Sequence, residues 1–266
     1  GLAVDYEWMN RQMFYNAYQR VAGLFGNTDC QATGLPGPQE LALLEPWRGK
    51  VPDAVFGPMY VPPRTDGDSS LRANLRKARE LLRQAGWEIR DGVLRNARGE
   101  AFTLEYMDSN EAGARVVSPW MRNLEKLGIQ LRFRPVDFAL YQQRLQKFDF
   151  EVTSLAYQGT HTPGQEFADL FGSKAADTED SGNHAGVKSP AVDDMVQRMT
   201  GARTKAELLP ACRALERIIA HSHYLIPQWT AGTHRIAYNA WRLALPQSSP
   251  PYANSEAWAI DTWWAK

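Results

Sequence analysis

The sequence has 266 residues, enough for one large domain or for a domain with an appendage, and 44% of the residues are hydrophobic. Its 30 basic side chains balance its 30 acidic ones, so no overall charge draws the chain to nucleic acid or to an anionic membrane. No run of about 18 apolar residues occurs, so the sequence predicts no membrane-spanning helix. No signal peptide opens the chain, and the abrupt start at Gly1 leads us to expect a piece cut from a longer protein.

The first part of the chain combines a predicted helix with a long irregular segment. Apolar residues along one side of residues 5–20 predict an amphipathic helix. Residues 21–68 are rich in glycine, proline, asparagine and aspartate, and only a short predicted helix at residues 39–44 interrupts them. Loops of this length are uncommon in compact domains unless they are functional or pack against a neighbour.

A clear helix and a β-hairpin follow. Ser69 or Ser70 is the predicted N-cap of the helix, and Gly86 ends it. The hairpin joins residues 87–90 to residues 93–95 through an Asp-Gly pair, the preferred two-residue turn.

The centre of the chain predicts an α/β fold. Residues 102–107 and 129–134 alternate between apolar and polar side chains, as half-buried strands do. A helix that ends at Gly128 separates them, and a second helix, capped by Asp137, leads to a third strand at residues 148–156. Strands that alternate with helices predict βαβ units with right-handed crossovers.

The loops after these three strands leave from the same edge of the predicted sheet, where open α/β sheets bind ligands. The loop after the third strand combines an aromatic ring, an amide, hydroxyls and a histidine, which suits a polar ligand, although a plain connecting loop remains the alternative. A similar argument applies to a glycine-flanked loop further on. The candidate ligand-binding residues are Asp108 and Ser109; Tyr157, Gln158, Thr160 and His161; and Asn183 and His184.

The last third of the chain predicts helices followed by a tail. Residues 173–187 should be irregular, Pro190 begins a helix, and a capping box at Thr204 begins a longer one. Residues 224–226 and 235–238 read as strands. The tryptophan-rich remainder has few core signals and is expected to pack on something else.

No catalytic motif and no metal-binding spacing of histidines occurs in the sequence, so we expect neither an enzyme nor a metal or other cofactor. An enzyme would need titratable groups that converge on the cleft, and the sequence offers few beyond Asp108 and His161. For Cys30 and Cys212 both a disulfide and free thiols are open, and a buried free thiol at Cys212 is our expectation.

Several segments resemble motifs of the family 5 extracellular solute-binding proteins, the dipeptide- and oligopeptide-type receptors of bacterial ABC importers. They occur in the family's order between about residues 3 and 240: Ala3-Val-Asp-Tyr-Glu-Trp-Met-Asn10, the helix from Leu75 to Trp87, Phe148-Asp-Phe150, the segment from Asn183 to Asp194, and Tyr224-Leu-Ile-Pro227. The sequences of residues 34–36, 40–44 and 212–216 resemble the microcin C/oligopeptide-type branch most.

This resemblance implies a periplasmic binding protein-like fold of type II, cluster C, made of two lobes. Residues 1–225 would form the second lobe, with βαβ units in a mixed sheet and helices on both faces. Residues 226–266 would be a hinge and return segment that packs on a first lobe located upstream. The whole protein would reside in the periplasm, bind oligopeptides or peptide-like compounds between its lobes, and deliver them to the permease subunits of the importer.

One departure from the family concerns the grip on the ligand. Peptide receptors often carry an aspartate for the ligand's α-amine in the loop after the third strand, and aligning Pro163 with the proline of that loop places Gly159 at that position. A sugar or opine-like solute, stacked on an aromatic residue such as Trp229, is therefore an alternative to a peptide. A free-standing interaction module is an alternative to the receptor function itself.

Overall fold

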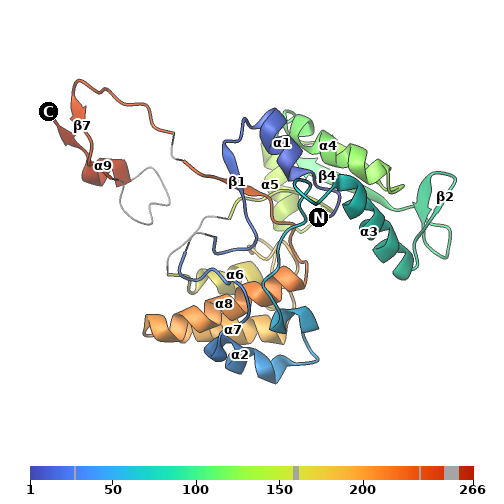
Figure 1. The fold of residues 1–266 in the computed structure, drawn as a ribbon, viewed down its shortest axis with the longest axis horizontal. Coiled ribbons are helices and arrows are strands. Elements are labelled where there is room, and N and C mark those ends of the chain that lie inside the picture. The colour runs from blue at the N-terminus through green and yellow to red at the C-terminus, as the bar shows by residue number, and fades with distance from the viewer. Residues whose placement is uncertain (27, 158–161, 234, 249–257) are drawn as a thin grey trace.

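The computed structural model describes residues 1–26, 28–157, 162–233, 235–248 and 258–266. Its helices and strands form two packed parts, and the C-terminal segment projects away from both (Figure 1). The first part contains α1 (Tyr6–Met13), α3 (Leu71–Gln84), β2 (Glu88–Arg90), β3 (Val93–Arg95), β4 (Thr103–Asp108), α4 (Gly113–Glu125), β5 (Gln130–Pro135) and α5 (Phe138–Gln146). The second contains α2 (Pro38–Leu44), α6 (Glu166–Phe171), α7 (Pro190–Gly201) and α8 (Lys205–His221).

Short elements complete the fold. An antiparallel pair joins β1 (Tyr18–Arg20) to β6 (Trp229–Ala231), so the chain's last third returns to its beginning. The projecting segment holds β7 (Leu243–Ala244), α9 (Trp258–Thr262) and β8 (Trp264–Ala265), and β7 pairs with β8. Three 3₁₀ turns lie at Glu45–Trp47, Asp53–Phe56 and Ala175–Asp177.

The parallel pair β4–β5, joined through α4, confirms the predicted βαβ unit. Gly128 ends the connection with a φ of +75°, and a Cβ there would lie 2.6 Å from the backbone nitrogen of Leu94, so glycine is required. Apolar side chains from α3, α4 and both strands form the core of this part, among them Ala78, Val117, Leu124 and Leu131.

The third strand and the mixed sheet are smaller than predicted. Only Val152 forms a bridge, parallel to Tyr106 of β4, through hydrogen bonds of 2.8 Å to the Met107 N–H and 3.1 Å to the Glu105 carbonyl. The strands of the described residues form four two-stranded sheets. After this bridge, side-chain contacts rather than a backbone ladder hold Thr153 and Ser154 against β4.

Local signals in the sequence predict the ends of several elements correctly. The Ser70 hydroxyl accepts the Ala73 N–H at 3.1 Å and begins α3, and the Asp137 carboxylate accepts the Leu140 N–H at 3.0 Å and begins α5. Asp91 and Gly92 both have positive φ, 51° and 78°, as the tight turn between β2 and β3 requires.

The first predicted helix is wrong in its length. It covers only Tyr6–Met13 instead of residues 5–20, and β1 occupies the end of the predicted range. The Asn10 side chain bonds the backbone N–H and carbonyl of Tyr18 at 3.3 and 2.9 Å, and this holds the chain folded back on α1. Tyr15 and Asn16, both with positive φ, form the reversal.

Two buried charged side chains of α8 fasten the irregular segment of residues 21–68. The Glu216 carboxylate accepts the backbone N–H groups of Phe25 at 2.9 Å and Ala32 at 2.5 Å, and burial raises its pKa. The Arg217 guanidinium pairs with Glu40 at 2.8 Å and also donates to the backbone carbonyls of Thr33, Gly34 and Gly57. The irregular segment is thus packed on a neighbour, as its length predicts.

The cysteine prediction is wrong. Cys30 and Cys212 form a disulfide, with their Cα atoms 5.5 Å apart, and both residues are fully buried. Cys212 lies on α8 and Cys30 in the irregular segment, so the bond joins the same two elements as Glu216 and Arg217. Proximity in the fold, which the sequence separation of 182 residues conceals, decides the pairing.

The two strands predicted after α8 are also wrong. Neither residues 224–226 nor the described residues 235–238 form a strand, and β6 lies between them. Trp229–Ala231 has β1 as a partner, and a strand depends on such a partner more than on its own propensity.

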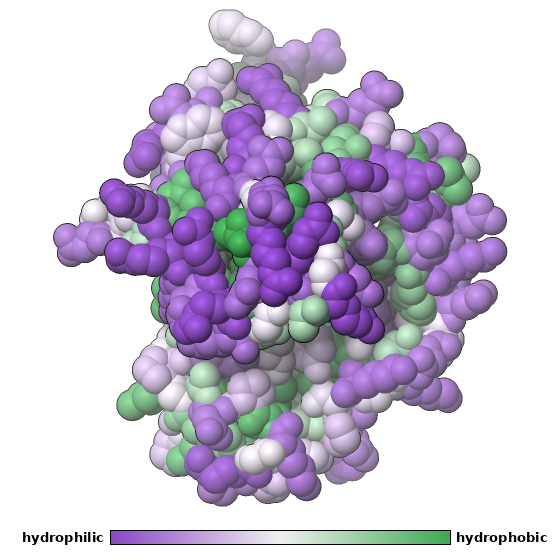
Figure 2. All heavy atoms as spheres, turned by 90° about the vertical axis from the view of Figure 1, so that its right-hand side faces the viewer, coloured by the Kyte–Doolittle hydropathy of each residue, from purple (hydrophilic) through white to green (hydrophobic). Residues whose placement is uncertain are grey.

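The surface is mostly polar on the face that bears α3 and β2. Figure 2 shows hydrophilic side chains over most of this face, with hydrophobic ones in small areas between them. Among the described residues, no helix has the length and apolar character needed to cross a lipid bilayer.

Candidate functional site

The carboxyl end of β4 is built from three chain segments. The Thr153 hydroxyl donates to the Met107 carbonyl at 3.0 Å and meets the Tyr141 hydroxyl of α5, also at 3.0 Å. The hydroxyls of Tyr106 and Ser154 are hydrogen-bonded to each other. These contacts lead the chain along β4 towards the loop after residue 156, where the sequence predicts ligand contacts.

Asp108 and Ser109 lie at this edge, as predicted. Asp108 ends β4, is half-buried, and accepts the Asn110 N–H at 2.9 Å on one carboxylate oxygen. Its backbone carbonyl accepts the Val136 N–H at 2.9 Å, which joins the loops after β4 and β5. The Ser109 side chain is exposed and open to contact from outside.

Tyr157 is the last described residue before the predicted binding loop. Its half-buried ring stacks on Phe171, the last residue of α6, with ring centroids 5.8 Å apart. Burial raises the pKa of its hydroxyl, which stays neutral and able to donate. The other members of this loop, Gln158, Gly159, Thr160 and His161, lie outside the described residues.

Asn183 and His184 have different surroundings, although they are neighbours. The Asn183 amide is fully buried and bonds three backbone groups at 2.9 Å each: the carbonyls of Gly172 and Val187 and the N–H of Val187. This fixes the loop that carries His184. The half-buried His184 ring lies within 6.1 and 6.3 Å of the rings of Phe148 and Phe150, measured between centroids.

The end of α6 contacts two of the candidate residues, Tyr157 and Asn183. Tyr157 stacks on Phe171, and Asn183 bonds the carbonyl of the next residue, Gly172, so the end of α6 holds both loops. Phe150, beside His184, packs with Met107 at the end of β4. Met107, Phe150 and His184 thus connect the end of β4 to the loop that carries Asn183.

Trp229 lies in a separate aromatic cluster. It is half-buried on β6, and its ring centroid is 6.3, 5.0 and 6.5 Å from those of Tyr6, Phe14 and Tyr18. Its stacking partners come from α1, the reversal after it and β1, so the cluster lies where the chain's last third returns to its beginning.

Sequence reasoning missed a pocket of about 580 Å³ next to this cluster. It lies between α1, β1 and residues 61–66, and Arg20 is one of its lining residues. Burial lowers the pKa of Arg20 from its ordinary value. The turn after Met13 forms one wall of this pocket. Because the sequence predicts a continuous helix over residues 5–20, it predicts neither this turn nor the pocket.

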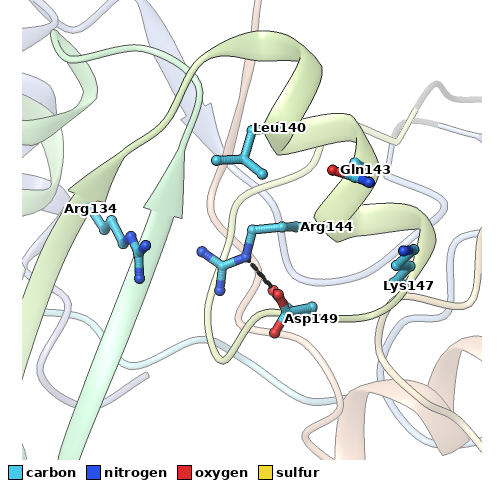
Figure 3. Close-up of a pocket in the computed structure, with 6 residues that line it drawn as sticks. All are labelled: Arg134, Leu140, Gln143, Arg144, Lys147 and Asp149. Carbon is cyan, nitrogen blue, oxygen red and sulfur yellow. Dashed lines mark hydrogen bonds and ion pairs between the residues drawn. The ribbon is translucent and has the colours of Figure 1, made fainter.

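A second hollow, of about 520 Å³, lies beside α5. Figure 3 shows that Leu140, Gln143 and Arg144 of α5, Lys147 directly after it, Arg134 of β5 and Asp149 line this hollow. Its two arginines are neutralised, since Arg134 and Arg144 pair with Glu105 at 2.9 and 3.1 Å. Their hydrogen bonds, that from Arg134 foremost, hold the pKa of Glu105 below its usual range. An ion-pair network of Arg134, Arg144, Glu105 and Asp149 thus lies beside this hollow.

In the ranges that the structure describes, no cluster of three or more His, Cys, Asp or Glu side chains could hold a metal ion. Asp108, Tyr157 and His184 offer hydrogen-bonding groups and aromatic faces, which are the means of binding a polar molecule.

Comparison with known proteins assigns the fold to a family. Residues 1–179 match the family described as "Bacterial extracellular solute-binding proteins, family 5 Middle". Since the match covers more than half of the sequence, the chain belongs to the family 5 extracellular solute-binding proteins.

Individual relatives agree with this assignment. The chain is 36% identical over 265 residues to the probable peptide-binding protein YejA of Agrobacterium fabrum, and the match covers 99% of the chain and 42% of YejA. The structure is similar to that of the oligopeptide-binding protein AppA of Bacillus subtilis in complex with a nonapeptide, with a TM-score of 0.66, 14% identity, and coverage of 100% of this chain and 46% of AppA. A mannohexaose-bound periplasmic oligopeptide-binding protein of Thermotoga maritima has a TM-score of 0.64 and 17% identity, with coverage of 100% and 48%.

These comparisons confirm the predicted fold class, the α/β fold of the periplasmic oligopeptide-binding proteins. The chain spans less than half of the length of each of these three proteins.

Proposed function

We propose that this chain is part of the substrate-binding component of a bacterial ABC importer, which binds oligopeptides or peptide-like compounds and delivers them to the permease. The observation that carries the proposal is the family match over residues 1–179, together with a relative that is named as a probable peptide-binding protein. In this role the protein is a receptor, neither an enzyme nor a cofactor carrier. Closure over the solute is a hinge motion, driven by tighter binding to the closed state.

Residues 1–225 form the second lobe in this proposal, and residues 226–266 form the hinge and the return to a first lobe. The projecting C-terminal segment supports it (Figure 1). Trp241 and Trp264 in this segment are 91% and 54% exposed, and burial against a partner lobe would remove this apolar surface from water.

The periplasm is the proposed location. The buried disulfide between Cys30 and Cys212 supports it, because disulfides form and persist in oxidising compartments such as the bacterial periplasm.

The proposed solute contacts lie at the carboxyl edge of β4 and in the loops beside it. They are Asp108, Ser109, Tyr157, Gln158, Thr160, His161 and His184. Asn183, with its amide committed to three backbone groups, would support the loop of His184 from behind. Gly159 offers no carboxylate for a peptide's α-amine, so the amine would be bound elsewhere or left free.

A sugar or opine-like solute is the second candidate. The Thermotoga maritima protein, similar in structure, was solved with mannohexaose bound, which supports a saccharide on this fold. Trp229 would then stack on the solute, and its half-buried position leaves part of the ring open.

Tyr157 offers a test of the proposed site. In a protein of its relatives' length, we expect Tyr157→Ala to weaken peptide binding more than tenfold, because the proposal places this side chain in contact with the solute; His161→Ala should do the same. Isothermal titration measures the affinity. Trp87→Ala is the matched control, since this half-buried ring packs on Phe102 at the opposite end of β4, with centroids 4.7 Å apart. Unchanged affinity in both the Tyr157 and the His161 variants would refute the site.

A further inference from the structure

Two nitrogen atoms of the Arg20 guanidinium are buried without a hydrogen-bonding partner. Its Nε and Nη1 atoms are inaccessible to solvent, and neither has an acceptor among the described residues. The group lies over the ring of Tyr6, 5.0 Å from the ring centroid, which holds it in place without using its N–H groups. Buried charged donors are normally paired, so this arrangement calls for an acceptor.

The acidic groups of the same pocket are already committed. Glu7 accepts the backbone N–H of Thr65 at 3.1 Å and its hydroxyl at 2.9 Å, and Asp66 pairs with Arg64 at 2.7 Å. The Asn10 amide is bonded to the backbone of Tyr18. The lining therefore has donors in excess, and the buried ones belong to Arg20.

The charge and the walls of the pocket narrow the class of ligand. Three arginines, Arg11, Arg20 and Arg64, face two carboxylates, Glu7 and Asp66, which leaves one net positive charge for an incoming group. A ligand with a single negative charge would neutralise this net charge, whereas a doubly charged phosphate would leave one negative charge in excess. Apolar residues complete the lining, namely Val21, Ala22, Val61 and Pro62.

We propose that the Arg20 pocket binds a carboxylate. The planar guanidinium presents two parallel N–H groups to the two oxygens of such a group. Two sources supply this chemistry: the solute, which rests on the proposed receptor function, and an Asp or Glu side chain from the rest of the longer protein. The volume of about 580 Å³ is within the range of small-molecule sites and admits either.

The test uses a protein of the relatives' length and two probes, an alanine-rich nonapeptide with a free C-terminal carboxylate and the same peptide with a C-terminal amide. With a solute carboxylate, the acid binds at least tenfold more tightly than the amide. Arg20→Gln abolishes this preference, and Arg122→Gln, a change at an exposed arginine of α4, preserves it.

Melting temperatures distinguish the second source. If a carboxylate of the protein itself occupies the pocket, acid and amide bind equally. Arg20→Gln then lowers the melting temperature of the longer protein by several degrees and leaves that of the 266-residue chain unchanged. Peptide binding with neither an acid preference nor this difference in melting temperature overturns the carboxylate site and leaves the receptor function intact. No peptide binding, combined with the difference in melting temperature, overturns the peptide-receptor function and supports the site.

Discussion

Replacing Arg217 by methionine is expected to lower the free energy of unfolding by about 3–5 kcal/mol, the usual cost of removing one partner of a buried ion pair. The Arg217 side chain is fully buried and pairs with Glu40, which is itself only 7% exposed. Methionine fills much of the volume but leaves the Glu40 charge uncompensated. It also removes the donors to the backbone carbonyls of Thr33, Gly34 and Gly57.

Urea denaturation of the purified protein measures this loss, with two controls. Arg198→Gln removes a surface pair with Asp194 of 2.9 Å on α7, and we expect a loss below about 1 kcal/mol. The double variant Glu40→Leu with Arg217→Met removes both charges together, and should recover part of the stability. A loss from Arg217→Met no larger than that from Arg198→Gln would show that the pair does not hold the irregular segment.

Removal of the disulfide is expected to have a similarly large effect. Replacing Cys30 and Cys212 by alanine should lower the free energy of unfolding by about 2–5 kcal/mol, because the bond restricts the unfolded chain over a long loop. The two residues are separated by 182 positions, so the loop that the bond closes is a long one.

Thermal unfolding with and without a thiol reductant provides the measurement. The reductant should lower the melting temperature of the native protein to that of the double alanine variant, and should leave the variant unchanged. A native protein whose melting temperature is insensitive to complete reduction would contradict the stabilising role of the bond between α8 and the irregular segment.

The Arg217–Glu40 pair and the disulfide both attach the irregular segment to α8. Asp29 extends this attachment at the surface, where it pairs with Lys205 at 3.1 Å and accepts the Arg213 guanidinium on its backbone carbonyl at 2.8 Å. The sequence predicts that such a long segment packs on a neighbour. It does not identify α8 as that neighbour, because the contacts join residues more than 170 positions apart.

What the sequence predicts well depends on short-range physics. The caps at Ser70 and Asp137 and the turn at Asp91 and Gly92 each involve atoms within three residues of one another. The Asn10–Tyr18 contact spans eight residues and ends a helix that its periodicity alone would extend. The strand β6 depends on its distant partner β1, and the sequence alone predicted strands on either side of it.

In the candidate site too, the sequence predicts some features and leaves those that depend on packing unpredicted. Strand order predicts the edge that carries Asp108 and Tyr157, since parallel strands expose their carboxyl ends together. The burial of Asn183 and the unpaired guanidinium of Arg20 are properties of packing, and no residue pattern announces them.

In the proposed function, this chain supplies one half of a solute-binding cleft. Isothermal titration of the same nonapeptide into the 266-residue chain and into a protein of its relatives' length tests it most directly. We predict micromolar or tighter binding by the longer protein and no measurable binding by the 266-residue chain, which lacks the opposite wall. Micromolar binding by the 266-residue chain alone, or none by the longer protein, would contradict the account.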